Sequence, residues 1–174
     1  MNILTRPFTI AALVLATGVL CSCDGQYTMT DSFPSGIRTV HVPVWTRSKD
    51  VYRRGIEDRL TEAVIKRVQQ DSPYKNTDRS RADTLLTGRL ENIEQRVLSF
   101  DPDVGQAREM EMVLTVSWEW KDLRSGRVLR KESALRVSGT YIPQEPLDED
   151  FFQGGETVIN KIARRIVEQM QSDW

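Results

Sequence analysis

The sequence predicts an α+β domain, a two-layer sandwich in which two helices pack on one face of a four-stranded, mostly antiparallel sheet. Residues 109–121 alternate between apolar and polar side chains, which indicates a strand with one buried and one solvated face. Residues 51–71 and 156–174 each place apolar residues on a single helical stripe. The expected order is β-α-β-β-β-α, and two layers bury all the apolar faces together.

The first 22 residues have the pattern of a secretory signal peptide. Arg6 precedes an uncharged run from Pro7 to Cys23, and Asp24 is the first acidic residue. A membrane-spanning helix needs about 20 apolar residues, and the threonine, glycine and serine residues of this run make it too polar. We therefore expect cleavage and export rather than a transmembrane anchor.

The two cysteines of the chain explain how it could be anchored. Leu20-Cys21-Ser22-Cys23 resembles the bacterial lipobox, which implies cleavage after Ser22, diacylglycerol on the Cys23 thiol, and a further acyl group such as palmitate on the freed amine. Several acyl chains give a stable anchor, because each buried CH₂ contributes about 0.8 kcal/mol. The alternatives are an ordinary cleaved signal with a spare thiol, or a CxC metal motif that has only His41 to complete it.

Length and charge limit the classes of protein that fit this sequence. Removing residues 1–22 leaves roughly 150 residues, enough for one domain. We divide them into a polar, lipidated tether over 23–36 and a folded domain over 37–174. The whole chain has 24 basic and 25 acidic side chains, and this balance argues against a general nucleic-acid-binding protein, which would show a basic excess.

The first strand is predicted by the alternation of Val40, Val42 and Val44 with polar residues. Pro43 cannot donate a ladder hydrogen bond, so we expect this strand at an edge of the sheet or with that position facing outward. His41 falls on the face opposite the valines. A surface or interface histidine is a better interpretation there than a catalytic base.

The first helix is expected over residues 51–71, with Asp50 as its N-cap and the segment SPYKN ending it. Its apolar stripe consists of Ile56, Leu60, Ala63, Val64 and Val68.

Three further strands are expected after this helix. The strand over 82–100 changes its buried parity near Glu91 and Asn92, which predicts a β-bulge. The strand over 109–121 connects through a tight turn to a return strand over 128–141, which makes a long hairpin. Residues 141–155 are expected to be a loop before the helix over 156–174. The stripe of that helix consists of Ile159, Ile162, Ala163, Ile166 and Met170.

Catalytic and metal-binding patterns are weak, so we expect neither an enzyme nor a cofactor. Asp101 and Asp103 resemble the start of a calcium loop, but Gly105 and Met112 stand where further oxygen ligands are needed. Glu109 and Glu111 share one strand face, which would suit a small hydrolase. On an exposed sheet face, such pairs are more often solubilising charges.

Basic residues cluster around the hairpin of residues 109–141, and two interpretations remain open. Arginine suits bidentate phosphate binding, so the cluster could contact a phosphorylated lipid or an acidic partner. It could also be a solvated hairpin whose charges protect a sheet edge. The cluster consists of Lys121, Arg124, Arg127, Arg130, Lys131 and Arg136.

Several segments together resemble the LptE family of lipopolysaccharide-assembly lipoproteins. They are IRTVHVPVW, RVQQDSPYK, RSRADTLLTGRL, SWEWKDLRSGRVLRK and IARRIVEQMQSDW. The resemblance implies a non-enzymatic outer-membrane lipoprotein facing the periplasm. It also implies two partners: the β-barrel translocon subunit LptD, whose lumen such proteins partly fill, and lipopolysaccharide itself.

The resemblance also bears on the basic hairpin and on location. It implies that lipid contacts come from basic side chains near strand ends, a place that Arg124, Arg127, Arg130 and Lys131 occupy. Asp24 departs from the expected pattern, because an aspartate after the lipidated cysteine is an inner-membrane retention signal in the best-known sorting rule. The alternative function is a lipoprotein that activates a periplasmic cell-wall enzyme, since such activators also begin with a valine-rich strand and a helix.

Overall fold

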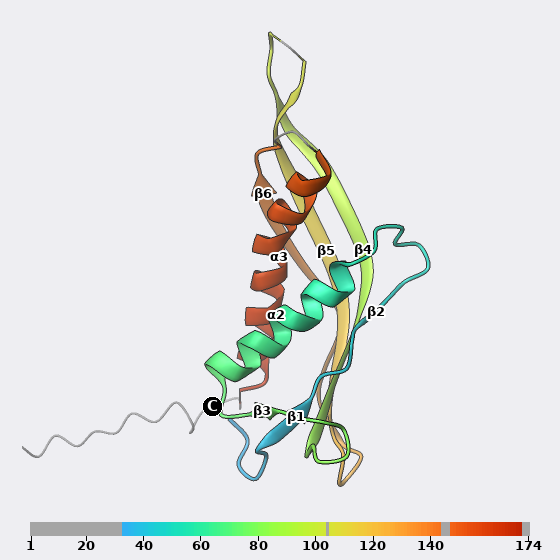
Figure 1. The fold of residues 1–174 in the computed structure, drawn as a ribbon, viewed down its shortest axis with the longest axis vertical. Helices are drawn as coiled ribbons and strands as arrows, with labels where there is room; N and C mark the ends of the chain where they lie inside the picture. The colour runs from blue at the N-terminus through green and yellow to red at the C-terminus, as the bar shows by residue number, and fades with distance from the viewer. Residues whose placement is uncertain (1–32, 104, 144–146, 172–174) are drawn as a thin grey trace, which may run out of the picture.

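The computed structural model describes residues 33–103, 105–143 and 147–171. In these ranges the chain forms six strands and two helices (Figure 1). In chain order they are β1 (Thr39–His41), β2 (Thr46–Arg47), α2 (Ile56–Asp71), β3 (Lys75–Asn76), β4 (Thr84–Phe100), β5 (Ala107–Asp122), β6 (Val128–Tyr141) and α3 (Leu147–Gln169).

The sheet is mixed, which corrects the expectation of four mostly antiparallel strands. Its order is β3-β1-β4-β5-β6, and β2 pairs with β4 beside β1. The β4–β5 and β5–β6 pairs are antiparallel, whereas β1 and β2 pair with β4, and β1 with β3, in parallel. Helix α2 explains the difference, because a strand–helix–strand connection returns the chain in the same direction.

The first strand is shorter and more central than expected. It ends at His41 and lies between β3 and β4, so the edge position belongs to the two-residue β3. Pro43 lies beyond the end of β1 and interrupts no ladder. The chain resumes pairing at β2, where Thr46 lies opposite Arg89.

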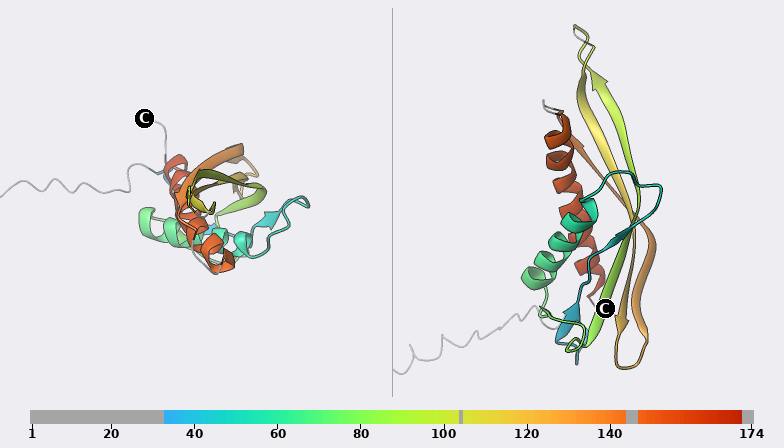
Figure 2. Two further views of the ribbon diagram at one scale, coloured as in Figure 1. Left: turned by 90° about the horizontal axis from the view of Figure 1, so that it is seen from above. Right: turned by 45° about the vertical axis from the view of Figure 1, so that its right-hand side comes forward.

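The two helices cover one face of the sheet, as expected (Figure 2). The even positions of β5 from 112 to 120 supply the centre of the core, so the predicted alternation is confirmed there, although Met110 is only half-buried and Val113 is buried as well. The even-numbered side chains are at most 3% exposed: Met112, Leu114, Val116, Trp118 and Trp120. The predicted bulge is also confirmed, because the β4–β5 register shifts between Leu90 and Asn92.

Helix α2 keeps the predicted stripe but not the predicted cap. Ile56, Leu60, Val64 and Val68 are fully buried. The helix starts five residues later than expected, directly after Gly55, whose φ of 88° lies in the left-handed region. The N-terminus has no side-chain cap, so Asp50 is not its N-cap.

Helix α3 begins at Leu147, within the stretch expected to be a loop. Gly154 and Gly155 lie in that stretch, but both are helical and serve packing. A Cβ on Gly154 would lie 2.4 Å from Tyr141 Cγ, and one on Gly155 would lie 3.4 Å from Met112 Sδ. The missing side chains therefore let α3 approach the sheet closely.

The molecule is elongated, because the β4–β5 hairpin continues past the start of α3 (Figure 1). Of the helices described, none is long and apolar enough to cross a bilayer.

Candidate binding surfaces

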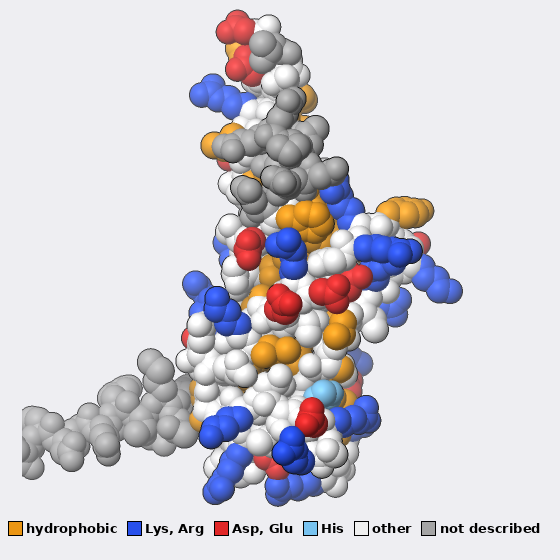
Figure 3. All heavy atoms as spheres, viewed as in Figure 1, with side chains coloured by type: hydrophobic (Ala, Val, Ile, Leu, Met, Phe, Trp, Pro, Cys, Tyr) orange, Lys and Arg blue, Asp and Glu red, His pale blue; other side chains and the backbone are white. Residues whose placement is uncertain are grey.

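One end of the sheet gathers cations from segments far apart in sequence. They come from the residue before β1, from β3, from the β3–β4 loop, and from the β5–β6 turn with the end of β5. We call this surface the basic end, and Figure 3 shows its charge at the bottom of the molecule. It consists of Arg38, Lys75, Arg79, Arg81, Lys121, Arg124 and Arg127.

Asp83 holds these segments together. Its Oδ2 accepts hydrogen bonds from the backbone N–H of Arg38 (3.0 Å), the backbone N–H of Thr39 (3.1 Å) and the Thr39 hydroxyl (2.9 Å). Its Oδ1 accepts a hydrogen bond from the Arg124 guanidinium. The N–H of Arg38, and then the Thr39 and Arg124 donors, lower the pKa of this carboxyl, although burial opposes them. The carboxylate thus fixes β1 and the β5–β6 turn to the start of β4.

The acids of the basic end are all engaged internally. Asp78 pairs with Arg81 at 2.9 Å, and Asp83 pairs with Arg124. Asp122 Oδ1 accepts the backbone N–H of Arg124 at 2.7 Å, which is the first cause that lowers the pKa of Asp122. Within the described residues, five cations of the basic end have no ion-pair partner: Arg38, Lys75, Arg79, Lys121 and Arg127.

The four cations predicted from the hairpin have different surroundings. Arg127 is exposed in the turn beside Arg124, whose side chain is 75% exposed despite its ion pair. Arg130 lies opposite Trp120 within β6, and Lys131 Nζ lies 4.0 Å from a carboxylate oxygen of Glu119. The structure therefore brings Arg124 and Arg127 together at the basic end and places Arg130 and Lys131 a short way up β6.

Sequence reasoning missed the other half of this surface. Arg38, Lys75 and Arg79 join it because β1 and β3 add to the sheet in parallel, and that addition was not foreseen. The signal available was the density of basic residues in NTDRSRAD, directly before a recognisable strand.

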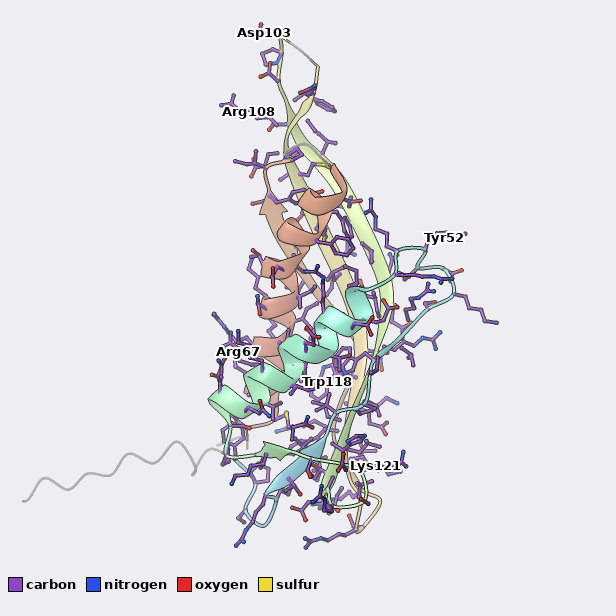
Figure 4. All side chains as sticks on the ribbon, in the orientation of Figure 1. Tyr52, Arg67, Asp103, Arg108, Trp118 and Lys121 are labelled. Carbon is purple, nitrogen blue, oxygen red and sulfur yellow. The ribbon has the colours of Figure 1, made fainter. Side chains whose placement is uncertain are left out.

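The opposite end of the molecule exposes apolar side chains. Val97 is 40% exposed, Leu98 50%, Phe100 64% and Ile142 67%. Met110 lies opposite both Val97 and Tyr141 in the sheet register, so Ile142 is close to the hairpin. We call these four residues the apolar tip. Figure 4 shows Asp103 and Arg108 at the same end.

Other residues considered from the sequence lie in ordinary structural settings. Glu109 and Glu111 are half-buried on β5, opposite Ser99 and Arg96. The His41 ring places Nδ1 2.8 Å from the Thr77 carbonyl oxygen. Among the described residues, no group of histidine, cysteine and acidic side chains is arranged to hold a metal ion. Cys23, Asp24 and the tether up to residue 32 lie outside the described residues.

Comparison with known proteins decides the family. The model of the lipopolysaccharide-assembly family LptE matches residues 37–174. The chain belongs to the LptE family. The match confirms the family resemblance that the sequence segments indicated. LptE is a family of non-enzymatic lipoproteins of the Gram-negative envelope.

Solved structures support the fold of this LptE-family chain. A lipoprotein from Caulobacter crescentus is 17% identical with a TM-score of 0.50, covering 75% of this chain and 86% of that one. Lipoprotein B from Nitrosomonas europaea is 13% identical with a TM-score of 0.50, covering 80% and 85%. No curated protein matches the sequence. At these identities the likeness shows the fold alone.

Proposed function

We propose that this LptE-family protein is an outer-membrane lipoprotein that assists lipopolysaccharide assembly by binding both an LptD-like β-barrel and lipopolysaccharide. The observation that carries the proposal is the family match, which spans the whole folded domain. No catalytic step is proposed. The protein acts by holding other molecules.

The anchor is the first part of the proposal. Residues 1–22 are removed as a signal peptide, Cys23 is acylated, and residues 23–36 tether the domain over 37–174. Mass spectrometry of the mature protein from membranes is expected to find an N-terminal acylated cysteine. Separation of inner and outer membranes decides between outer-membrane location and the retention that Asp24 suggests.

The cations on and near the hairpin are the proposed contact for lipopolysaccharide. Arg124, Arg127, Arg130 and Lys131 lie on or beside one turn, and Arg127 has no ion-pair partner among the described residues. A guanidinium can give two parallel hydrogen bonds to one phosphate group. The phosphate groups of a glycolipid match this chemistry.

The binding test compares two charge-reversed proteins. Arg127→Glu with Arg130→Glu is expected to reduce lipopolysaccharide binding at least tenfold. The control reverses Lys66 and Arg164, which are exposed on α2 and α3, and is expected to bind as the natural protein does. Circular dichroism checks that both variants fold. Equal binding by the two variants would remove the hairpin from the proposal.

The second partner is tested separately. The elongated shape and the apolar tip suit insertion into a wide barrel, because exposed apolar patches mark protein contacts. Purification from membranes in mild detergent is expected to recover a large β-barrel protein. Recovery of a peptidoglycan synthase in its place would favour a regulator of cell-wall synthesis.

A further inference from the structure

We infer that the free edge of β6, beside a basic face of α3, binds an extended acidic segment of a partner protein, which adds to the sheet as a further strand. The site is a groove of about 470 Å³, which we call the α3–β6 groove. It is lined by residues 136–138 of β6 and by four exposed residues of α3: Lys161, Arg164, Arg165 and Glu168. The inference depends neither on lipopolysaccharide binding nor on the lipid anchor.

Strand β6 is the last strand of the sheet, so no strand of the described residues pairs with its outer edge. The half of β6 nearer the β5–β6 turn is irregular, because register shifts interrupt its pairing near Trp118 and Trp120. The other half pairs with β5 without a shift from Leu135 to Tyr141, and it contains no proline. Bulges and prolines protect sheet edges against a further strand. The regular half of β6 has neither, so charge is its remaining protection.

One hydrogen bond shows which backbone groups of β6 face outward. Lys161 Nζ donates to the Ser138 carbonyl oxygen at 3.2 Å, so this carbonyl points to the free side of the strand. Because bonding directions alternate along an antiparallel strand, the N–H and C=O groups of Arg136 and Thr140 point the same way. The backbone N–H of an added strand would replace Lys161 on Ser138, and the freed ammonium group would then meet an acidic side chain.

Helix α3 supplies the charge of the groove. The helix runs antiparallel to β6 (Figure 1) and approaches it closely at Gly139, where a Cβ would lie 2.8 Å from Val158 Cγ2. Past this point its exposed face carries Lys161, Arg164 and Arg165 along the strand edge. None of these three cations has an ion-pair partner among the described residues. An acidic segment would supply the opposite charge.

The spacing of the cations matches the repeat of a strand. Lys161 and Arg165 lie about 6 Å apart along the helix axis, and side chains on one face of a strand repeat about every 6.8 Å. Two acidic residues at alternate positions of an added strand can therefore each meet a cation. Glu168 lies almost one turn further along α3 and favours a basic residue at the next alternate position. The expected pattern in a strand antiparallel to β6 is acid–x–acid–x–base, where x is uncharged.

A second copy of the chain and a compact anion both fit the groove less well. Pairing between the β6 strands of two copies would bring Arg136 and the α3 cations of both together, and like charges across a strand pair are destabilising. A single phosphate group would satisfy the cations but not the row of outward backbone groups. The apolar tip lies beyond this edge, so a strand bound here leaves the tip free for the proposed barrel contact.

A synthetic peptide tests strand addition in the full, acylated protein held in mild detergent. The sequence TETETKT is as long as the regular half of β6, and its charged residues take the positions that face α3. In this arrangement the threonine N–H groups face β6, and the N–H groups of the charged residues face solvent. We expect binding by fluorescence anisotropy of the labelled peptide. N-methylation of the threonines is expected to abolish binding, whereas N-methylation of the charged residues leaves it unchanged.

Charge reversal in the protein tests the contact with α3. Lys161→Glu with Arg165→Glu is expected to weaken binding of TETETKT about tenfold, because two exposed attractions become repulsions. The charge-reversed peptide TKTKTET is expected to bind this variant better than it binds the natural protein, and such a gain cannot come from unfolding. The matched control reverses Arg54 and Lys66, which are exposed at and near α2, and is expected to bind TETETKT normally.

The outcomes separate this inference from the proposed function. Failure of TETETKT to bind, or equal binding of the two methylated peptides, overturns strand addition. Equal binding of TETETKT by the Lys161 and Arg165 variant and by the control overturns the contact with α3. Displacement of the peptide by lipopolysaccharide assigns the groove to the glycolipid and overturns the inference, while it leaves lipopolysaccharide binding intact. No result with these peptides removes the proposed assembly function.

Discussion

At the scale of single residues, Asp83 does the most to shape the basic end. One carboxylate accepts hydrogen bonds from the start of β1 and from the β5–β6 turn. Cations that repel one another are thereby held at one end of the sheet. A loss of this carboxylate should affect both stability and the placement of Arg124.

Asp83→Ala is expected to lower the free energy of unfolding by about 2–3 kcal/mol at pH 7, since hydrogen bonds to a charged group contribute about 1.5–3 kcal/mol. Folding lowers the pKa of Asp83, so its stabilisation is complete above the unfolded pKa, about 4, and is lost as the pH falls through the folded pKa. Urea unfolding from pH 7 to pH 3 should therefore show the two proteins converging. A constant difference in unfolding free energy between the two proteins over this pH range would contradict the prediction. Asp78→Ala is the control, because Asp78 belongs to an exposed ion pair.

Gly88 is the second residue whose identity the fold requires. A Cβ at this position would lie 2.3 Å from the Trp45 ring, which is 2% exposed. Gly88→Ala is expected to cost about 1–3 kcal/mol of unfolding free energy through overpacking. Trp45→Leu in the same chain should recover part of that loss, since the two positions share one space. If the losses of unfolding free energy from Gly88→Ala and Trp45→Leu simply add in the double variant, the contact between the two positions does not cause the loss.

At the scale of elements, the β4–β5 hairpin combines two roles along its length. Strand β5 pairs with β6 from Met110 to Lys121 and supplies the buried core, whereas the outer end of β4 carries three residues of the apolar tip: Val97, Leu98 and Phe100. Because those side chains are not part of the core, they can change without unfolding the domain. They are therefore suitable for testing a partner contact.

Leu98→Ser with Phe100→Ser is expected to change the free energy of unfolding by less than about 0.5 kcal/mol. Recovery of the proposed β-barrel partner from membranes is expected to fall severalfold. Val44→Ser with Tyr52→Ser is the matched control, because those side chains are 65% and 91% exposed elsewhere on the molecule. Unchanged recovery of the barrel would exclude the apolar tip as a contact.

At the scale of the whole molecule, the sequence predicted what repeats over many residues. The alternation in β5 and the stripe of α2 identified the core face of each element, and hence the two layers. The two-residue strands β2 and β3 are too short to show any period, so the parallel part of the sheet was missed. The early start of α3 was missed for a related reason, because Gly154 lies close to Tyr141 in the folded chain, and sequence spacing does not display that approach.

The same limit applied to the binding surface. Arg124 and Arg127 were found because neighbours in sequence share one turn. Arg38 and Arg79 lie in other segments, and only strand pairing brings them beside the hairpin. The sequence therefore indicated the chemistry of the basic end but only half of its extent.

The parallel pairing of β1 also constrains the order in which the chain can fold. Thr39 is held by Asp83, which lies 44 residues later, whereas β4, β5 and β6 follow one another through short turns. Closing long loops is entropically slower than zipping neighbouring strands. During synthesis from the N-terminus, β1 emerges first but cannot pair with β4 until β4 has followed it, so Val40 stays uncovered in the interval.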